Sequence, residues 1–412
     1  MPPPSMSTLP PEFIAEILTE LPVKSLVRFL CVSKLWYAMI NNPDFIKKHL
    51  KRSIEANRER TLIVQDCERL SNQDPCFKKF EDNNRRPPYF YSVRFHDDGR
   101  FDRAVRLYQP LRHRRAKATI LYYCNGLVCL YNLETEIVIW NPLIRKYKKL
   151  PFEPIDIPSG FKKEVSHSIW NSPAMWSEFA FGHDPVNDDY KVVRVSELIS
   201  WCDREFEVKI YSLRAHSWRR VKHKWPKKES SIASKPAFLN GAVHWLAATH
   251  SRRSLEMLVA LDLATEKFRM YKTPFKLGHG VSKLELEVLG GALCVCVHRY
   301  MEESDSVWVM KEYGLASSWT LLCTITQEAV IYCKPLVFSK NGEKVLIEQD
   351  FDKLFWYDVE EETASKVEIL GMPDNFRTAT CVGSLVLLNG DNVIDVDLEE
   401  GDSEDLGWWN YW

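Results

Sequence analysis

Cys294 and Cys296 are the residues best suited to chemistry, because two thiols that are two positions apart on a strand point to the same face and could hold a metal ion. No matched pair of cysteines or histidines accompanies them, so we expect buried side chains that act as small apolar groups. His244 stands beside Trp245 in an apolar run, and we expect a core histidine rather than a catalytic base. The chain has no P-loop, His-Glu-x-x-His or Gly-x-Ser-x-Gly motif, so we predict no catalytic residue, no cofactor and no metal.

Charged clusters are the second class of candidate site. Residues 85–86 and 112–115 are basic, and residues 397–412 form an acidic tail that ends in four aromatic side chains within five residues. We expect the basic clusters to be solvated loops and the aromatic end of the tail to pack on the main domain.

Composition limits the class of protein. The 412 residues carry a net charge of −1, and 45% of them are hydrophobic, so the chain can bury a large core but has no general attraction for nucleic acid. No apolar run is long enough to span a membrane, no secretory signal is evident, and the 11 cysteines lack regular spacing. We therefore predict a cytoplasmic protein, with the nucleus as the alternative, that binds neither nucleic acid nor a membrane.

One unit recurs five times after residue 119: a strand ends near a turn, and an aromatic or apolar residue begins the next strand. The pairs are Trp140 and Tyr147, Tyr211 and Trp218, Leu261 and Phe268, Tyr313 and Trp319, and a weaker Trp356 and Lys366. From Trp218 onward the period is roughly 50 residues, which is typical of a kelch-like propeller blade. Residues 152–176 lengthen the first interval and, with three prolines and one glycine, predict a loop.

Packing such units in a ring covers both faces of each four-stranded sheet. We predict a mainly-β domain folded as a kelch-like β-propeller, with six blades favoured over seven and a two-sheet sandwich as the competing fold. A first strand is expected at residues 61–65. Strands near residues 89–93, together with residues 379–388 and 393–396, would complete the sixth blade from both ends of the domain. Asn-Gly pairs begin at Asn125, Asn240, Asn341 and Asn389, and each predicts a type I′ hairpin turn.

The first fifty residues predict three short helices, which is too little chain for a core of its own. Thr8 and Ser33 are expected to cap the first and third helices, Pro22 to separate the first two, and Pro43 to follow the end of the third. Apolar residues lie on more than one face of these helices, so we expect a second apolar surface that a partner covers. Residues 51–60 are expected to finish a linking helix.

This stretch resembles the F-box, through Leu9-Pro10, Glu16-Ile17-Leu18, residues 21–26, residues 31–34 and Trp36. The resemblance implies docking to the Skp adaptor and, through it, to a cullin scaffold. The alternative is a plain helical cap on the larger domain. The expected adaptor-binding residues are Leu9, Pro10, Ile14, Ile17, Leu18, Leu21, Pro22, Leu26, Val27, Cys31, Val32 and Trp36.

The β-rich part resembles the F-box-associated domain of plants, through residues 124–129, 140–142, 181–185, 189–193 and 239–246. Within that group it is most similar to S-locus F-box proteins. The resemblance implies a non-catalytic substrate receptor of a Skp–cullin–F-box ubiquitin ligase, whose protein target in the S-locus case would be a pistil S-RNase. The predicted domains are residues 1–50 (F-box), 51–60 (linking helix), 61–396 (propeller) and 397–412 (tail).

Target contacts are expected on the loops that interrupt the repeat, at residues 152–176, 196–204, 249–253 and 300–305. Acidic residues on these loops would steer a basic partner: Glu197, Asp203, Glu205, Glu302, Glu303 and Asp305. The alternative function is a propeller enzyme or a carbohydrate-binding module with an unrelated helical cap. Perturbed acidic residues that converge in the central channel would favour that alternative.

Overall fold

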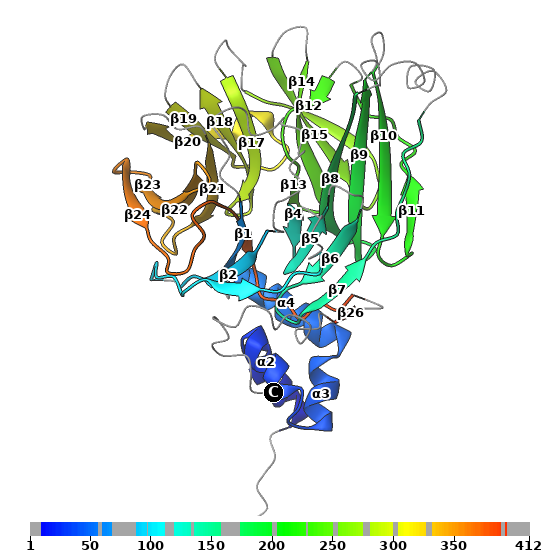
Figure 1. Ribbon diagram of the computed structural model, residues 1–412, viewed down its shortest axis with the longest axis vertical. Helices are drawn as coiled ribbons and strands as arrows, with labels where there is room; N and C mark the ends of the chain where they lie inside the picture. The colour runs from blue at the N-terminus through cyan, green and yellow to red at the C-terminus, as the bar shows by residue number, and fades with distance from the viewer. Residues whose placement is uncertain are drawn as a thin grey trace, which may run out of the picture.

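The structure is a computed structural model, and the residues that it describes form four α-helices and six β-sheets (Figure 1). The residues that it describes are 10–56, 60–67, 88–96, 98–111, 119–132, 136–157, 174–199, 204–227, 230–249, 254–274, 281–299, 304–326, 332–388 and 392–393. Thr8, both basic clusters, Asn389 and the acidic tail therefore lie outside the described residues.

The helical domain contains the three predicted helices and one more. Its helices are α1 (Pro11–Thr19), α2 (Val23–Phe29), α3 (Lys34–Ile40) and α4 (Pro43–Glu55). The Ser33 hydroxyl accepts a hydrogen bond from Trp36 N at 3.2 Å, which confirms the predicted cap of α3. Pro43 begins α4, because the Asn42 side chain caps it at Asp44 N (2.8 Å). The helix expected at residues 51–60 is therefore the second half of α4, which ends at Glu55.

The β-rich domain is a six-blade propeller, as predicted. Blade 1 combines β25 (Phe376–Cys381) with β1 (Thr61–Asp66), β2 (Phe90–Arg94) and β3 (Val105–Leu107), and blade 2 holds β4 (Thr119–Cys124), β5 (Leu127–Tyr131), β6 (Ile137–Asn141) and β7 (Lys146–Lys149). Blade 3 holds β8 (Ala174–Asp184), β9 (Asp189–Ile199), β10 (Arg204–Ser212) and β11 (Ser217–Arg220).

The other blades follow in chain order. Blade 4 holds β12 (Ser230–Ile232), β13 (Ala237–Leu239), β14 (Ala242–Thr249), β15 (Ser254–Asp262) and β16 (Phe268–Lys272), and blade 5 holds β17 (Val281–Leu289), β18 (Ala292–Arg299), β19 (Ser304–Met310) and β20 (Trp319–Thr326). Blade 6 holds β21 (Cys333–Phe338), β22 (Lys344–Gln349), β23 (Lys353–Asp358) and β24 (Thr363–Val367). The five repeating units coincide with the two outer strands of blades 2 to 6.

Both ends of the domain close the ring. β25 pairs with β1 from Thr61 opposite Cys381 to Asp66 opposite Phe376. Val393 does not join this blade as predicted: β26 (Asn392–Val393) instead pairs with β7 at the outer edge of blade 2, and residues 394–396 lie outside the described residues. The intervening chain runs under blade 2, where the Asn141 amide donates to the carbonyl oxygens of Ser384 (3.0 Å) and Val386 (3.1 Å). These bonds lead the chain to the open edge of β7.

The turns agree with the Asn-Gly predictions in two hairpins. Asn125 and Gly126 have φ angles of 53° and 79°, and Asn240 and Gly241 have angles of 51° and 73°, as a type I′ turn requires. Asn341 does not have positive φ, because its hairpin turn is longer and closes between Ser339 and Lys344. The loop predicted at residues 152–176 is shorter than expected, since β8 begins at Ala174.

Candidate functional site

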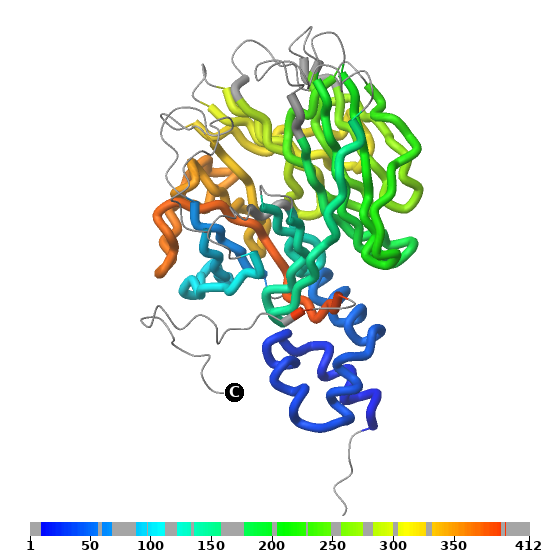
Figure 2. Tube along the Cα trace, turned by 45° about the vertical axis from the view of Figure 1, so that its right-hand side comes forward, coloured from blue at the N-terminus to red at the C-terminus, as the bar shows by residue number. Residues whose placement is uncertain are grey.

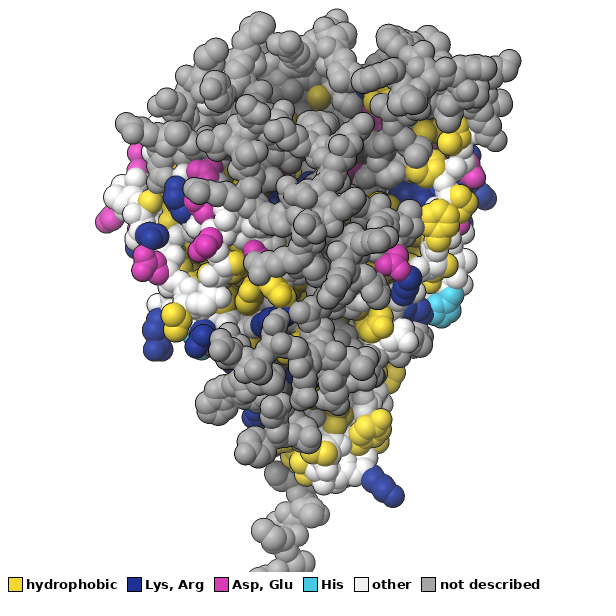
Figure 3. Space-filling view, viewed as in Figure 1, with side chains coloured by type: hydrophobic (Ala, Val, Ile, Leu, Met, Phe, Trp, Pro, Cys, Tyr) yellow, Lys and Arg dark blue, Asp and Glu magenta, His cyan; other side chains and the backbone are white. Residues whose placement is uncertain are grey.

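The helical domain presents an apolar surface. Phe13, Ile17, Val32, Leu35 and Tyr37 are between 53% and 61% exposed, and hydrophobic side chains are visible on this lower end of the molecule in Figure 3. Such a concentration of large exposed apolar groups in a domain this small is typical of a protein interface.

The predicted adaptor-binding residues divide into three groups. Pro10, Ile17, Pro22, Cys31 and Val32 are exposed. Half-buried residues are Ile14, Leu21, Val27 and Trp36. Leu18 and Leu26 are 1% and 0% exposed, so their predicted place on the surface is wrong.

Leu18 and Leu26 belong to the core of the helical domain, where Val23, Ile40 and Phe45 are also buried. Helical spacing identified the apolar residues of these helices. It did not show which of their faces is buried, because only the second half of α4 was predicted from the sequence. Phe13, Leu35 and Tyr37 were omitted from the predicted set for the same reason. Leu9 lies outside the described residues.

Ion pairs hold α1 against α4. The Arg52 guanidinium contacts Glu16 at 2.6 Å and Glu20 at 3.1 Å, and Lys48 also binds Glu16. The hydrogen bonds from Lys48 and Arg52 lower the pKa of Glu16. On the inner side, the His49 ring donates from Nε2 to the Leu21 carbonyl oxygen at 2.9 Å. The exposed apolar surface therefore rests on a fixed helical frame.

The helical domain and the propeller share one core. A continuous cluster of buried apolar side chains includes Phe45 and Leu50 of α4, Leu127 of β5 and Phe181 of β8. The segment after β25 contributes Leu385, Val386 and Leu388 to this cluster, and Figure 2 shows that segment beside the helices. Too few residues lie in the helical domain to bury its own apolar faces, and blades 2 and 3 supply the missing surface.

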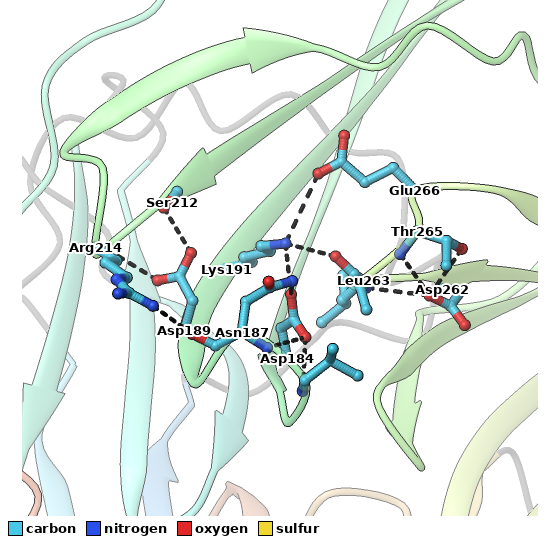
Figure 4. A network of polar contacts seen from close by, with 12 residues as sticks. Asp184, Asn187, Asp189, Lys191, Ser212, Arg214, Asp262, Leu263, Thr265 and Glu266 are labelled. Atoms are coloured by element: carbon cyan, nitrogen blue, oxygen red, sulfur yellow. Dashed lines mark hydrogen bonds and ion pairs between the residues drawn. The ribbon is translucent and has the colours of Figure 1, made fainter.

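An ion pair marks the edge of this contact. Lys47 of α4 lies 2.6 Å from Asp188, in the turn between β8 and β9, and the hydrogen bond from Lys47 lowers the pKa of Asp188. A network of polar contacts holds the same turn (Figure 4). In that network the buried Asp184 carboxylate accepts from Asn187 Nδ2 (2.7 Å) and Lys191 Nζ (2.8 Å).

The network also joins two blades. Lys191 of blade 3 donates to the Leu263 carbonyl oxygen at 2.5 Å and lies 3.7 Å from Glu266, both in blade 4. Burial opposes ionisation of Asp184, but its hydrogen bonds with Asn187 and Lys191 lower its pKa overall. Asp184-Pro185 is thus part of a structural turn, and this turn supports the surface on which α4 rests.

The acidic residues predicted to steer a target do not form one exposed group. Glu197 is 4% exposed and lies 3.1 Å from Arg204, while Asp305 is 2% exposed and accepts from His298 at 2.8 Å. Both are therefore wrong as surface residues, because a neighbouring strand supplies a cation or an N–H donor that allows burial. Glu205 is half-buried. Asp203, Glu302 and Glu303 lie outside the described residues.

The residues considered for metal binding or catalysis have structural roles. Cys294 and Cys296 are buried, and burial raises the pKa of both thiols well above its usual value. His244 lies between blades 4 and 5: Nδ1 donates to the Ala237 carbonyl oxygen (3.2 Å), and Nε2 accepts from the Tyr313 hydroxyl (2.8 Å). Burial lowers the pKa of His244 to about 4, so the ring is neutral.

One buried cluster was not foreseen. The Cys296 thiol, the His298 ring and the Asp305 carboxylate bring ligand atoms within 4.8 Å of one another. Both ring nitrogens of His298 are engaged, because Nδ1 donates to Asp305 (2.8 Å) and Nε2 accepts from Cys333 N (3.4 Å). The alternation Cys-x-His in one strand was the available signal. A metal ion bound here would have to displace a hydrogen bond of the ring.

Two acidic residues with shifted pKa values lie on or beside the inner strands. Convergence of such residues in the central channel would favour an enzyme. Burial raises the pKa of Glu287 and Glu348. Glu287 lies 3.1 Å from Lys334, and Glu348 accepts from Thr378 N at 2.7 Å. The two carboxylates thus hold neighbouring strands together, which favours a structural role. Among the described residues, no helix is both long and apolar enough to cross a membrane.

Two family matches cover most of the chain. Residues 6–48 match the family described as F-box domain, and residues 79–390 match the family described as F-box associated beta propeller domain. F-box protein CPR1 of Arabidopsis thaliana is 30% identical over 412 aligned residues, which cover 93% of this chain and 89% of that protein. F-box protein At4g22390 of the same organism is 26% identical and covers 93% of this chain and 91% of its own length.

The similarity to solved structures is low. Oligogalacturonate lyase in complex with manganese aligns with a TM-score of 0.41 and 8% identity, over 69% of this chain and 71% of that chain. A similarity at this level supports no inference about activity.

Proposed function

The chain belongs to the family of F-box proteins that carry an F-box associated beta propeller domain, and from this membership we propose that it is the substrate-recognition subunit of a Skp–cullin–F-box ubiquitin ligase. Residues 1–50 bind the Skp adaptor, and residues 61–396 bind the protein to be ubiquitinated. The chain supplies no catalytic group. It raises the effective concentration of target lysines near an enzyme that the ligase recruits elsewhere.

The apolar surface of the helical domain is the observation that carries the proposal. Its contact residues would be the exposed members of the predicted set, joined by Phe13, Leu35 and Tyr37. Leu18 and Leu26 support that surface from within. The shared core then fixes the propeller relative to the adaptor, which suits a receptor that must present its target in one orientation.

Replacement of two exposed anchors tests this proposal. Each buried anchor of a protein interface is worth about 2 kcal/mol, so Ile17→Asp combined with Val32→Asp should abolish co-purification with the Skp adaptor. Leu321→Asp with Leu370→Asp is a matched control, because these residues are 45% and 71% exposed on the propeller. Both double variants should melt near the wild-type temperature. Adaptor binding by a folded Ile17/Val32 variant at wild-type strength would refute the proposal.

A narrower proposal concerns the target. Among plant proteins with an F-box-associated domain, the chain is most similar to S-locus F-box proteins, and this resemblance supports an S-RNase as target. The charge argument for it is weakened, since Glu197 and Asp305 are paired and buried. Binding of purified S-RNases to the full chain, with a ribonuclease of similar charge as control, tests this assignment.

A further inference from the structure

A strained turn in blade 6 holds one ring of a stacked aromatic pair. Phe351, in the turn between β22 and β23, stacks on Tyr332 with ring centroids 4.2 Å apart and an interplanar angle of 17°. Asp350 and Phe351 have φ angles of 51° and 64°, in the left-handed region that bulky residues seldom adopt. Hydrogen bonds fix this turn: Tyr332 N donates to Asp350 Oδ1 (2.9 Å), and Asp350 N to the Tyr332 carbonyl oxygen (3.0 Å). Strain held in this way often marks a binding site.

The pair faces away from the helical domain. The turns that join the first and second strands of the blades lie on one face of the propeller, and Lys47 contacts such a turn at Asp188. The turn at Phe351 joins the second and third strands of blade 6, so chain alternation places it on the opposite face. A ligand bound at this turn would leave the adaptor surface free.

Two cations contact the aromatic pair. Lys283 Nζ lies 4.1 Å from the Tyr332 ring centroid, and Arg377 Cζ lies 5.0 Å from the Phe351 centroid. Lys283 also forms an ion pair with Glu285 at 2.8 Å. Arg377, which is half-buried, has no ion pair and no hydrogen-bond acceptor among the described residues. Contact with a ring engages the flat face of a guanidinium and leaves its N–H groups available.

A third cation, Lys235, comes from the opposite side of the ring. Lys235 lies between β12 and β13 of blade 4, whereas Arg377 belongs to β25 of blade 1. These blades are opposite each other in a ring of six, so Arg377 and Lys235 come from opposite sides of the ring. Repulsion by Arg377 is the main reason that the pKa of Lys235 is lowered to about 8, and Lys334 and Lys283 add to the repulsion. Lys235 is solvent-exposed and has no ion pair among the described residues.

The nearby carboxylates make their direct contacts with groups other than these two cations. Glu285 pairs with Lys283 and Glu287 with Lys334. Glu348 Oε2 accepts hydrogen bonds from the backbone N–H and the hydroxyl of Thr378. Arg377 and Lys235 therefore form no direct ion pair with these carboxylates, although Glu348 attracts Arg377 and Glu285 attracts Lys235 at longer range.

We propose that Arg377, Lys235 and the Tyr332–Phe351 pair form a binding site for an acidic segment of the target protein. A carboxylate would accept two hydrogen bonds from the Arg377 guanidinium in its plane, Lys235 would add a second charge contact, and the aromatic pair would hold the guanidinium in position. This inference rests on the proposed function and gives it a substrate class, a protein with an exposed run of Asp or Glu.

The probe for this site is a fluorescein-labelled hexaglutamate peptide, with a hexaglutamine peptide as its neutral match. The full chain should bind hexaglutamate, measured by fluorescence anisotropy, and bind hexaglutamine much more weakly. Arg377→Gln should weaken binding about tenfold or more, as expected when a charged hydrogen-bond partner is lost. Arg377→Lys should recover only part of the lost affinity, because lysine keeps the positive charge but cannot donate two parallel hydrogen bonds to one carboxylate. Lys235→Gln should also weaken binding.

Lys366→Gln and Lys51→Gln are charge-matched controls, because both lysines are exposed and lie elsewhere on the chain. An equal loss of binding in these controls, or equal binding of the two peptides by the wild type, would overturn the proposal. Unchanged binding by both the Arg377→Gln and Lys235→Gln variants would also overturn it. Every variant should still bind the Skp adaptor. A failure of the peptide test with adaptor binding intact therefore rejects this site alone, and not the receptor function.

Discussion

Lys47 of α4 and Asp188 of the β8–β9 turn form an ion pair 2.6 Å long across the boundary between the helical domain and the propeller. Both side chains are more than half exposed, so this contact alone adds little to stability. The ion pair marks the boundary between the two domains. Beneath it, one buried apolar cluster is continuous from α1 to blade 3.

The first prediction is that the two domains unfold together. Phe45 is 7% exposed within the shared cluster, and Phe45→Ala should lower the free energy of unfolding by about 3–5 kcal/mol. Calorimetry should give a single transition in both the wild type and the variant. Lys47→Gln is the control and should cost less than about 1 kcal/mol. Two separate transitions, with only the smaller one shifted by Phe45→Ala, would contradict a shared core.

The second prediction concerns pH and His244. The folded-state pKa of about 4 lies below the ordinary value of 6.5, so the unfolded chain binds more protons between these values. The contribution of His244 to the free energy of unfolding is roughly 3 kcal/mol. It is complete above pH 6.5 and is lost as the pH falls toward 4. Urea unfolding should show a flatter pH dependence for His244→Gln, whereas the exposed His223→Gln should behave as the wild type. Equal slopes for His244→Gln and the wild type would rule this out.

The third prediction concerns ring closure. A chain that ends at Asn375 lacks β25 and leaves β1 without its inner partner, so it should not fold cooperatively. A chain that ends at Leu388 keeps β25 and the segment that packs against α4, and should melt within a few degrees of the wild type. A chain that ends at Ser384 should fall between them, because it loses Leu385, Val386 and Leu388. A cooperative melt of the shortest chain would mean that closure is not required.

The fourth prediction compares two glycines with matched backbone angles. Gly126 and Gly342 have φ of 79° and 80°, so alanine should cost each turn a similar strain of about 1 kcal/mol. A Cβ at Gly126 would also lie 2.8 Å from the Val382 carbonyl oxygen, whereas Gly342 has no neighbour within 4 Å. Gly126→Ala should therefore be more destabilising by roughly 1–3 kcal/mol in thermal unfolding. Equal losses of stability in the two variants would mean that the segment after β25 can shift away from residue 126 at no cost in free energy.

Repetition made the propeller predictable, but not the length of its strands. The valine-rich run at residues 191–195 is typical of a short strand, whereas β9 extends from Asp189 to Ile199. The extension contains Glu197, which is compatible with a buried strand because Arg204 on β10 neutralises it at 3.1 Å. An apolar run in the sequence shows where a strand must be buried. It does not show where an ion pair with a distant residue lets the strand continue.

The adaptor surface was predictable only as a set of helices with surplus apolar faces. Ile17 and Leu18 are adjacent and equally apolar, yet one is 53% exposed and the other 1%. The difference is set by α4, which packs on α1 through Arg52 and Glu16. The site near Arg377 could not be read from the sequence at all, because its residues come from blades 1, 4, 5 and 6 and meet only when the ring closes.

The shared core has a geometric consequence for ubiquitination. A receptor whose two domains were joined by a flexible linker could sweep a target through many positions relative to the conjugating enzyme. Here α4 is embedded in the same buried cluster as β5 and β8, so the span from adaptor surface to propeller face has a fixed length and direction. In the proposed ligase, lysines at a matching distance from the bound segment would be modified, and those nearer or farther would be spared.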